Sequence, residues 1–106
     1  MSAPFCIAIT TVATEAQARE IAKAVLAARL VACVQLYPIH SHYAWKGELC
    51  EDAEIALHFK MRSADFAALQ ALVRQMHEYE TPEILRIDIA DGDAAYLDWL
   101  AEATKK

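Results

Sequence analysis

The sequence predicts an α+β domain in which one antiparallel sheet carries helices on a single face. Two observations lead to this class. Segments typical of strands and of helices follow each other in the order β-α-β-β-α-β-α, and the apolar spacing changes between two and about 3.6 residues from one segment to the next. The 106 residues suffice for one core, so we expect a single domain over residues 1–106.

The first strand and helix follow from local patterns. Residues 5–12 (FCIAITTV) form a β-rich run that is typical of a buried strand. Thr14 and Gln17 fit a capping box, in which the side chain of each residue accepts a hydrogen bond from the backbone N–H of the other. We expect this helix to end near Ala28, with an apolar stripe that faces the core.

A long hairpin comes next in the chain. Residues 31–45 are mostly extended, with an interruption at Pro38, because proline has no N–H for a strand ladder. Lys46 and Gly47 form the turn. Residues 49–61 alternate between apolar and polar side chains, which predicts a strand with one dry and one wet face. The apolar set of this strand is Ile55, Leu57, Phe59 and Met61.

The second half of the chain predicts a helix, a strand and a final helix. Ser63 is the expected N-cap of the first of these helices, and Asp65 lies near its positive end. The apolar stripe of that helix comprises Phe66, Leu69, Leu72, Val73 and Met76. Residues 84–89 alternate as in a strand, and Asp93 can cap a last helix from residue 94 to about 103.

Two β-α-β halves folded together give a ferredoxin-like sandwich, whose two helices cover only one face of the sheet. The other face must be wet or must pair with something. The long hairpin also carries apolar and aromatic side chains, namely Leu36, Tyr37, Tyr43, Trp45 and Leu49. Covering about 1,000 Å² of apolar surface per chain would gain roughly 25 kcal/mol before entropy costs. We therefore expect an obligate homo-oligomer.

Composition excludes several classes of protein. No apolar run reaches the length of a membrane-spanning helix, and no basic segment followed by an apolar run suggests a signal peptide. The net charge is −5 and the ten Lys and Arg residues are scattered, so we expect no nucleic-acid or membrane partner. Three cysteines, Cys6, Cys33 and Cys50, form no Cys-x-x-Cys pair, which favours a reducing, cytoplasmic setting.

The segment His77–Glu83 concentrates an imidazole, a phenol and three carboxylates in a short connection. Such groups suit a divalent cation, and the candidate metal ligands are His77, Glu78, Glu80 and Glu83. An ordinary acidic loop, with the histidine paired to a glutamate, is the alternative. His40 and His42 share one face of a strand, but we favour two exposed polar residues there over a metal site.

Enzymatic motifs are absent from the sequence. Gly47 and Gly92 are the only glycines, so no Gly-rich phosphate loop exists. The chain has no Gly-x-Ser-x-Gly elbow and no His-Glu-x-x-His helix. We expect neither an enzyme nor an organic cofactor.

Four segments together resemble one family. They are residues 30–34 (LVACV), 41–47 (SHYAWKG), 77–84 (HEYETPEI), and Gly92 with 96–99 (YLDW). The pattern resembles the CutA family of divalent-cation tolerance proteins and covers essentially the whole chain. The resemblance implies a ferredoxin-like fold in a homotrimer similar to the PII signalling proteins. It also implies a link to copper and other divalent metals, since some members bind copper.

The family's residues carry over unevenly to this chain. The loop from His77 to Glu83 matches a conserved loop that lies by a cleft between subunits in related proteins. We expect Cys33, Tyr43, Trp45, Lys60, Tyr79 and Trp99 to line such a cleft. Glu78 stands where proline is usual, and Met76 and Thr10 replace a histidine and a cysteine of some copper-binding relatives. The copper site of those relatives is therefore not expected here, although Met76 could donate a thioether to Cu(I).

Two functions remain open. The first is a homotrimeric cytoplasmic protein of divalent metal-ion tolerance, which binds copper or another divalent cation weakly. The second is a PII-like signalling module, which holds a small ligand in the cleft between subunits and acts on a protein partner that the sequence does not identify.

Overall fold

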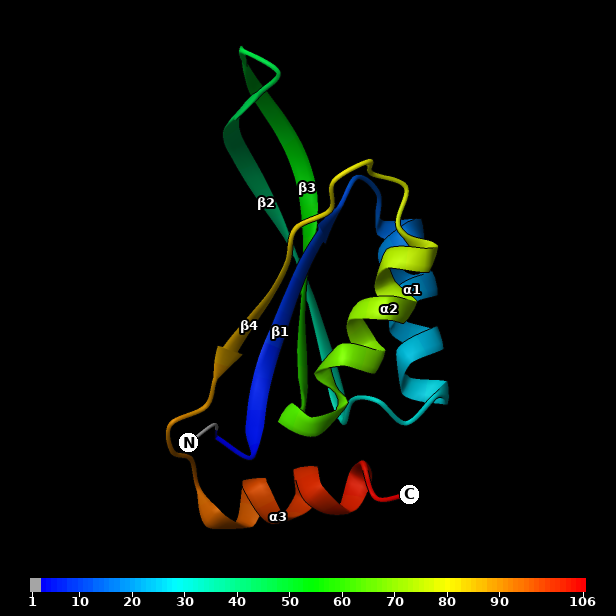
Figure 1. Ribbon diagram of the computed structural model, residues 1–106, viewed down its shortest axis with the longest axis vertical. Coiled ribbons are helices and arrows are strands. Elements are labelled where there is room, and N and C mark those ends of the chain that lie inside the picture. The colour runs from blue at the N-terminus through cyan, green and yellow to red at the C-terminus, as the bar shows by residue number, and fades with distance from the viewer. Residues whose placement is uncertain (1–2) are drawn as a thin grey trace.

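The computed structural model describes residues 3–106 and confirms the predicted order of elements (Figure 1). The strands are β1 (Phe5–Val12), β2 (Cys33–Trp45), β3 (Glu48–Arg62) and β4 (Ile84–Asp88). The α-helices are α1 (Glu15–Ala27), α2 (Phe66–Met76) and α3 (Ala94–Ala103), and a 3₁₀ turn, Ser63–Asp65, leads into α2.

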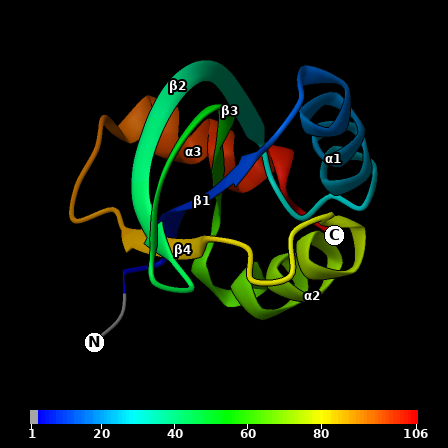
Figure 2. The ribbon, with the colours of Figure 1, turned by 90° about the horizontal axis from the view of Figure 1, so that it is seen from above.

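The four strands form one antiparallel sheet in the order β2-β3-β1-β4. Helices α1 and α2 lie on one face of this sheet, and α3 crosses the end at which β1 begins (Figures 1 and 2). The hairpin of β2 and β3 extends past the other elements at the opposite end. This arrangement confirms the predicted fold class, an α+β ferredoxin-like sheet with helices on one face and a long β2–β3 hairpin.

The core lies between the sheet and the two covering helices. Leu57, Phe59 and Met61 of β3 are buried there, as their alternation predicted. Their partners from the helices are Ile21, Val25, Leu69 and Val73. The wet and dry faces predicted for β3 are therefore confirmed over its second half.

Two of the predicted helix caps are confirmed. The Thr14 hydroxyl accepts from Gln17 N at 3.2 Å, and Asp93 Oδ2 accepts from Tyr96 N at 3.2 Å. The returning half of the capping box is wrong, because the Gln17 side chain turns away and donates to Met76 O at 3.1 Å. Gln17 thus satisfies a carbonyl at the end of α2, where the loop 77–83 begins.

Two further expectations need correction. Ser63 does not cap α2 with its side chain; the 3₁₀ turn supplies a backbone bond to Ser63 O instead. Pro38 does not interrupt β2, which continues to Trp45. The reason is position, because β2 is an edge strand and its outer side needs no N–H donor at residue 38.

The face of the sheet opposite α1 and α2 carries an apolar patch on β1 and β4, beside the polar residues His58 and Lys60 of β3. Leu85 and Ile87 of β4 point to this open face and are 52% and 53% exposed. Ile7 and Ile9 of β1 stand beside them in register. An exposed apolar patch of this kind, next to exposed aromatic residues of the hairpin, marks a surface for association.

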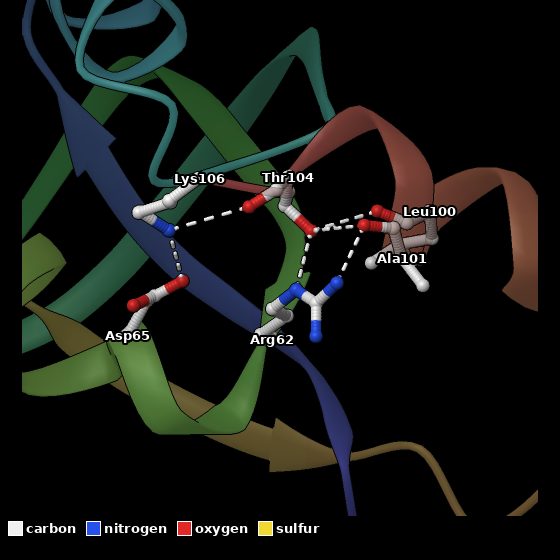
Figure 3. Close-up of polar contacts among 6 residues, drawn as sticks. All are labelled: Arg62, Asp65, Leu100, Ala101, Thr104 and Lys106. Atoms are coloured by element: carbon white, nitrogen blue, oxygen red, sulfur yellow. Dashed lines mark hydrogen bonds and ion pairs between the residues drawn. The ribbon is translucent and has the colours of Figure 1, made fainter.

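Polar contacts fasten α3 across the end of the sheet (Figure 3). Arg62 at the end of β3 donates to Thr104 Oγ1 at 2.9 Å and to Ala101 O at 2.6 Å. Lys106 Nζ lies 2.8 Å from Asp65 Oδ2. Arg62 therefore satisfies carbonyl and hydroxyl groups at the C-terminal end of α3, where a cation is also favourable.

Replacing the buried Thr104 tests this attachment. We expect Thr104→Val, which keeps the shape but removes the hydroxyl, to lower the free energy of unfolding by about 1–3 kcal/mol. Urea denaturation measures the change. Thr81→Val, at an exposed threonine, is the matched control, and an equal effect of both variants would contradict the role given to Arg62 and Thr104.

Candidate functional site

The loop of residues 77–83 is held to β1 by His77. The Nε2 atom of His77 lies 2.8 Å from Thr11 O, and its Nδ1 atom accepts from Tyr79 N at 3.1 Å. Because Nδ1 accepts, the proton of a neutral ring must be on Nε2, which donates to the Thr11 carbonyl. The ring also lies against Tyr79, with centroids 4.8 Å apart.

Both ring nitrogens of His77 are therefore engaged by the backbone. A metal ion needs a free nitrogen lone pair, and the only one on this tautomer already accepts from Tyr79 N. The geometry gives His77 the task of fixing the loop, rather than the metal-ligand role expected from the sequence. The loop carboxylates remain available.

Tyr79 turns the loop toward the sheet. Its hydroxyl donates to Glu54 Oε2 at 2.7 Å. Burial and this hydrogen bond raise the pKa of Tyr79, so the phenol stays neutral and remains the donor. Glu54 is 8% exposed and belongs to the part of β3 that lies next to the loop. The pair joins two segments 25 residues apart in the sequence.

A cavity of about 670 Å³ lies between this loop and the β2–β3 hairpin. We call it the loop cavity. Its acidic lining residues are Glu54, Glu78, Glu80 and Glu83, and its aromatic ones are Tyr43, Trp45 and Tyr79. Thr11, Ser41, His42 and Thr81 complete the lining. The structure thus brings together three of the predicted metal ligands and three of the predicted cleft residues.

The hairpin side of the loop cavity is fixed by polar contacts. The Tyr43 hydroxyl donates to Asp52, and this bond raises the pKa of Tyr43 to about 12. Lys46 and Gly47 at the tip have φ angles of 50° and 79°, as a two-residue type I′ turn requires. The Lys46 ammonium lies 3.4 Å from Glu80 Oε2, so the hairpin tip contacts the loop.

The other predicted cleft residues lie elsewhere. Cys33 pairs in register with Lys60, and Lys60 Nζ lies 6.0 Å from the ring centroid of Tyr96. Tyr96 in turn contacts Trp99, with centroids 5.5 Å apart. Cys33, Lys60 and Trp99 therefore gather near α3, away from the hairpin tip, and a single chain does not unite them with Tyr43, Trp45 and Tyr79.

No ready-made metal centre exists in residues 3–106, because no three His, Cys, Asp or Glu side chains converge closely enough to hold an ion. Thr10 is buried, and Met76 packs against the core at the end of α2. His40 and His42 are both exposed, as expected, but only His42 lines the loop cavity. It lies 3.9 Å from Glu51.

Sequence reasoning did not select Glu54 as a residue of the site, although it lines the loop cavity. Alternation placed Glu54 on the polar side of its strand, but its burial depends on Tyr79, which no local pattern reveals. The hairpin register pairs Ile39 with Glu54 and His42 with Glu51. Glu54 and His42 therefore start from opposite faces of the hairpin, and register alone does not predict that both line the loop cavity.

Comparison with known proteins decides the family. The model of the CutA1 divalent ion tolerance protein family matches residues 6–103. The chain belongs to this family. A CutA1 relative from Thermus thermophilus, named divalent-cation tolerance protein CutA, is 43% identical over 99 residues, which cover 92% of this chain and 96% of that protein. The human protein CutA is 40% identical over 99 residues. These residues cover 92% of this chain and 55% of the human protein, so the chain spans about half the length of that relative.

Solved CutA1 structures agree with the fold. The periplasmic divalent cation tolerance protein CutA from Archaeoglobus fulgidus superposes with a TM-score of 0.93 at 36% identity. The superposition covers 95% of this chain and 99% of that one. At this likeness the family's sheet, hairpin and helices are all present in the chain.

The anchoring role of His77 can be tested by truncation. We expect His77→Ala to lower the free energy of unfolding by about 1–3 kcal/mol, since it leaves Thr11 O and Tyr79 N without their partner. Urea denaturation gives this value, and faster hydrogen exchange at the Tyr79 amide reports the loosened loop. His40→Ala, at an exposed histidine, should change neither. Unaltered exchange at Tyr79 in His77→Ala would refute the anchor.

Proposed function

We propose that this chain is a homotrimeric cytoplasmic protein of divalent-cation tolerance, which binds copper or another divalent cation weakly in the loop cavity. Membership of the CutA1 family supports the tolerance role. The observation that carries the site is that His42 and three carboxylates of one loop, Glu78, Glu80 and Glu83, line the same cavity. Imidazole and carboxylate together suit copper and zinc.

Weak affinity follows from the geometry. Since no three of these groups converge in the described chain, the loop or the His42 side chain must move before an ion is held. That movement costs part of the binding free energy. Glu78 contributes a negative charge, and His77 keeps the loop near β1 while the carboxylates rearrange.

The metal proposal is tested by calorimetric titration with Zn²⁺ and Cu²⁺. We expect His42→Ala to weaken binding about tenfold or more, since an imidazole ligand is lost. His40→Ala is the matched control, because it removes a neighbouring exposed histidine that does not line the cavity. Binding should also weaken in mildly acidic solution, because a metal-bound imidazole must be deprotonated. Equal affinities of the two variants would exclude His42 as a ligand.

Trimer formation is supported by the open face of the sheet. Leu85 and Ile87 are more than half exposed there, and Tyr37, Tyr43, Trp45 and Leu49 are exposed along the hairpin. Further copies of the chain would remove this apolar surface from water, which is the dominant gain in association. The trimer itself is what the family resemblance implies.

Light scattering after gel filtration tests the assembly. We expect the chain to elute at three times its mass of 11.8 kDa, and Leu85→Asp to shift it toward a single chain by burying an unpaired charge. Leu26→Asp is the control, because Leu26 is also exposed, 44%, but lies on α1. A wild-type chain that stays monomeric at micromolar concentration would remove the proposed assembly.

The cytoplasmic setting rests on the thiols. Cys6, Cys33 and Cys50 are all free, which suits a reducing compartment. The Archaeoglobus fulgidus relative is described as periplasmic, so the family is not confined to one compartment by name. No helix in residues 3–106 is long and apolar enough to cross a membrane.

The second candidate function is a PII-like module that binds a small ligand. The size and lining of the loop cavity favour it, because small-molecule sites are typically about 300–1,000 Å³ with aromatic walls and a few polar groups. In a trimer, the cluster of Cys33, Lys60 and Trp99 from a neighbouring chain could complete such a site. Ligand binding without any heat from Zn²⁺ or Cu²⁺ would favour this function over the first.

A further inference from the structure

Glu54 is a carboxylate that the fold buries without a counter-charge. It is 8% exposed, and its Oε2 atom accepts one hydrogen bond, from the neutral Tyr79 phenol. In the part of the chain that the structure describes, Glu54 forms no ion pair. A buried anion is costly unless a cation accompanies it. Because Glu54 lines the loop cavity, a cation from solution can supply what the chain does not.

Aromatic walls indicate which kind of cation suits this cavity. Tyr43 and Trp45 line it and remain 42% and 40% exposed. Ring faces attract organic cations and also cover alkyl groups, whereas a small hydrated metal ion gains little from them. Glu54 together with these rings therefore favours an organic cation with an alkyl body.

The hairpin tip already places an ammonium group at the rim of the cavity. Lys46 Nζ lies 3.4 Å from Glu80 Oε2 and 5.5 Å from the centroid of the Trp45 ring. This is an alkylammonium in contact with one carboxylate and one ring of the lining. The Lys46 and Glu80 side chains are 69% and 72% exposed, so their pairing is weak and a ligand can displace it.

We propose that the loop cavity binds a small alkyl diamine, with one ammonium against the buried Glu54 and the other in place of Lys46 at Glu80. N–H donors are needed at both ends, since carboxylates accept hydrogen bonds there. The alkyl chain lies against Tyr43 and Trp45. This inference rests on the second candidate function, because it names the ligand class for the same cavity.

Calorimetric titration of the assembled full chain with 1,4-diaminobutane tests the proposal. We expect binding that weakens as salt rises, and little or no binding of 1,4-butanediol, which has the same length without charge. Tetramethylammonium, which has no N–H donor, should bind more weakly than the diamine. If the diol binds as tightly as the diamine, charge recognition is refuted.

Two substitutions locate the site. Glu54→Gln keeps an acceptor for Tyr79 and removes the charge, so diamine affinity should fall about tenfold or more. Glu102→Gln removes one charge from an exposed position on α3 and is the matched control. Lys46→Met removes the internal competitor and should strengthen binding, by about fivefold at most. Thermal unfolding of each variant verifies that it is folded.

Several outcomes would overturn the inference. One is the absence of binding heat when the diamine is added. Another is an equal loss of diamine affinity in Glu54→Gln and Glu102→Gln, and the third is a lower diamine affinity in Lys46→Met. The last variant changes an exposed tip residue, so it keeps the test valid should Glu54→Gln fail to fold. Zn²⁺ titration of the unmodified chain separates the proposals. If Zn²⁺ binds and the diamine does not, the diamine proposal is wrong and the metal function is retained. If the diamine binds and Zn²⁺ does not, only the metal function is excluded.

Discussion

The uneven covering of the sheet is the constraint on which the rest of this structure depends. Helices α1 and α2 cover one face of the sheet, and α3 crosses only one of its ends. The opposite face keeps Leu85 and Ile87 in contact with water, at a cost that grows with the exposed apolar area. The oligomer proposed above would cover this face, and the exposed apolar side chains of the long hairpin would be covered in the same way.

The loop cavity depends on two contacts, made by Gln17 and His77, that fix the start of the loop of residues 77–83. Gln17 holds the last carbonyl of α2, and His77 ties the next residues to β1. With the backbone held at these points, Tyr79 can reach Glu54, and the loop carboxylates line the cavity while they remain exposed to solvent. A histidine that would have been a plausible ligand thus determines the site by bonding to the backbone.

Much of the fold could be predicted from the sequence, because it depends on local patterns. Thr14 and Asp93 cap helices a few residues away, and the alternation of β3 selects its buried side chains. The site could not be predicted in this way. Gln17 finds its partner 59 residues along the chain, and His77 finds one 66 residues away. The residues next to Gln17 and His77 in the sequence do not indicate these distant partners. The tautomer of His77 can therefore be assigned only from the folded structure.

The loop cavity and the open face are connected through β3. Glu54 alternates with Ala56, His58 and Lys60, so all four stand on the side of the strand that faces away from α1 and α2. Beyond Glu54 the strand leaves the sheet and enters the hairpin, whose partner within the chain is β2. A ligand against Glu54 would therefore touch a strand whose residues His58 and Lys60 stand on the open face, beside Ile9 and Ile7 of β1.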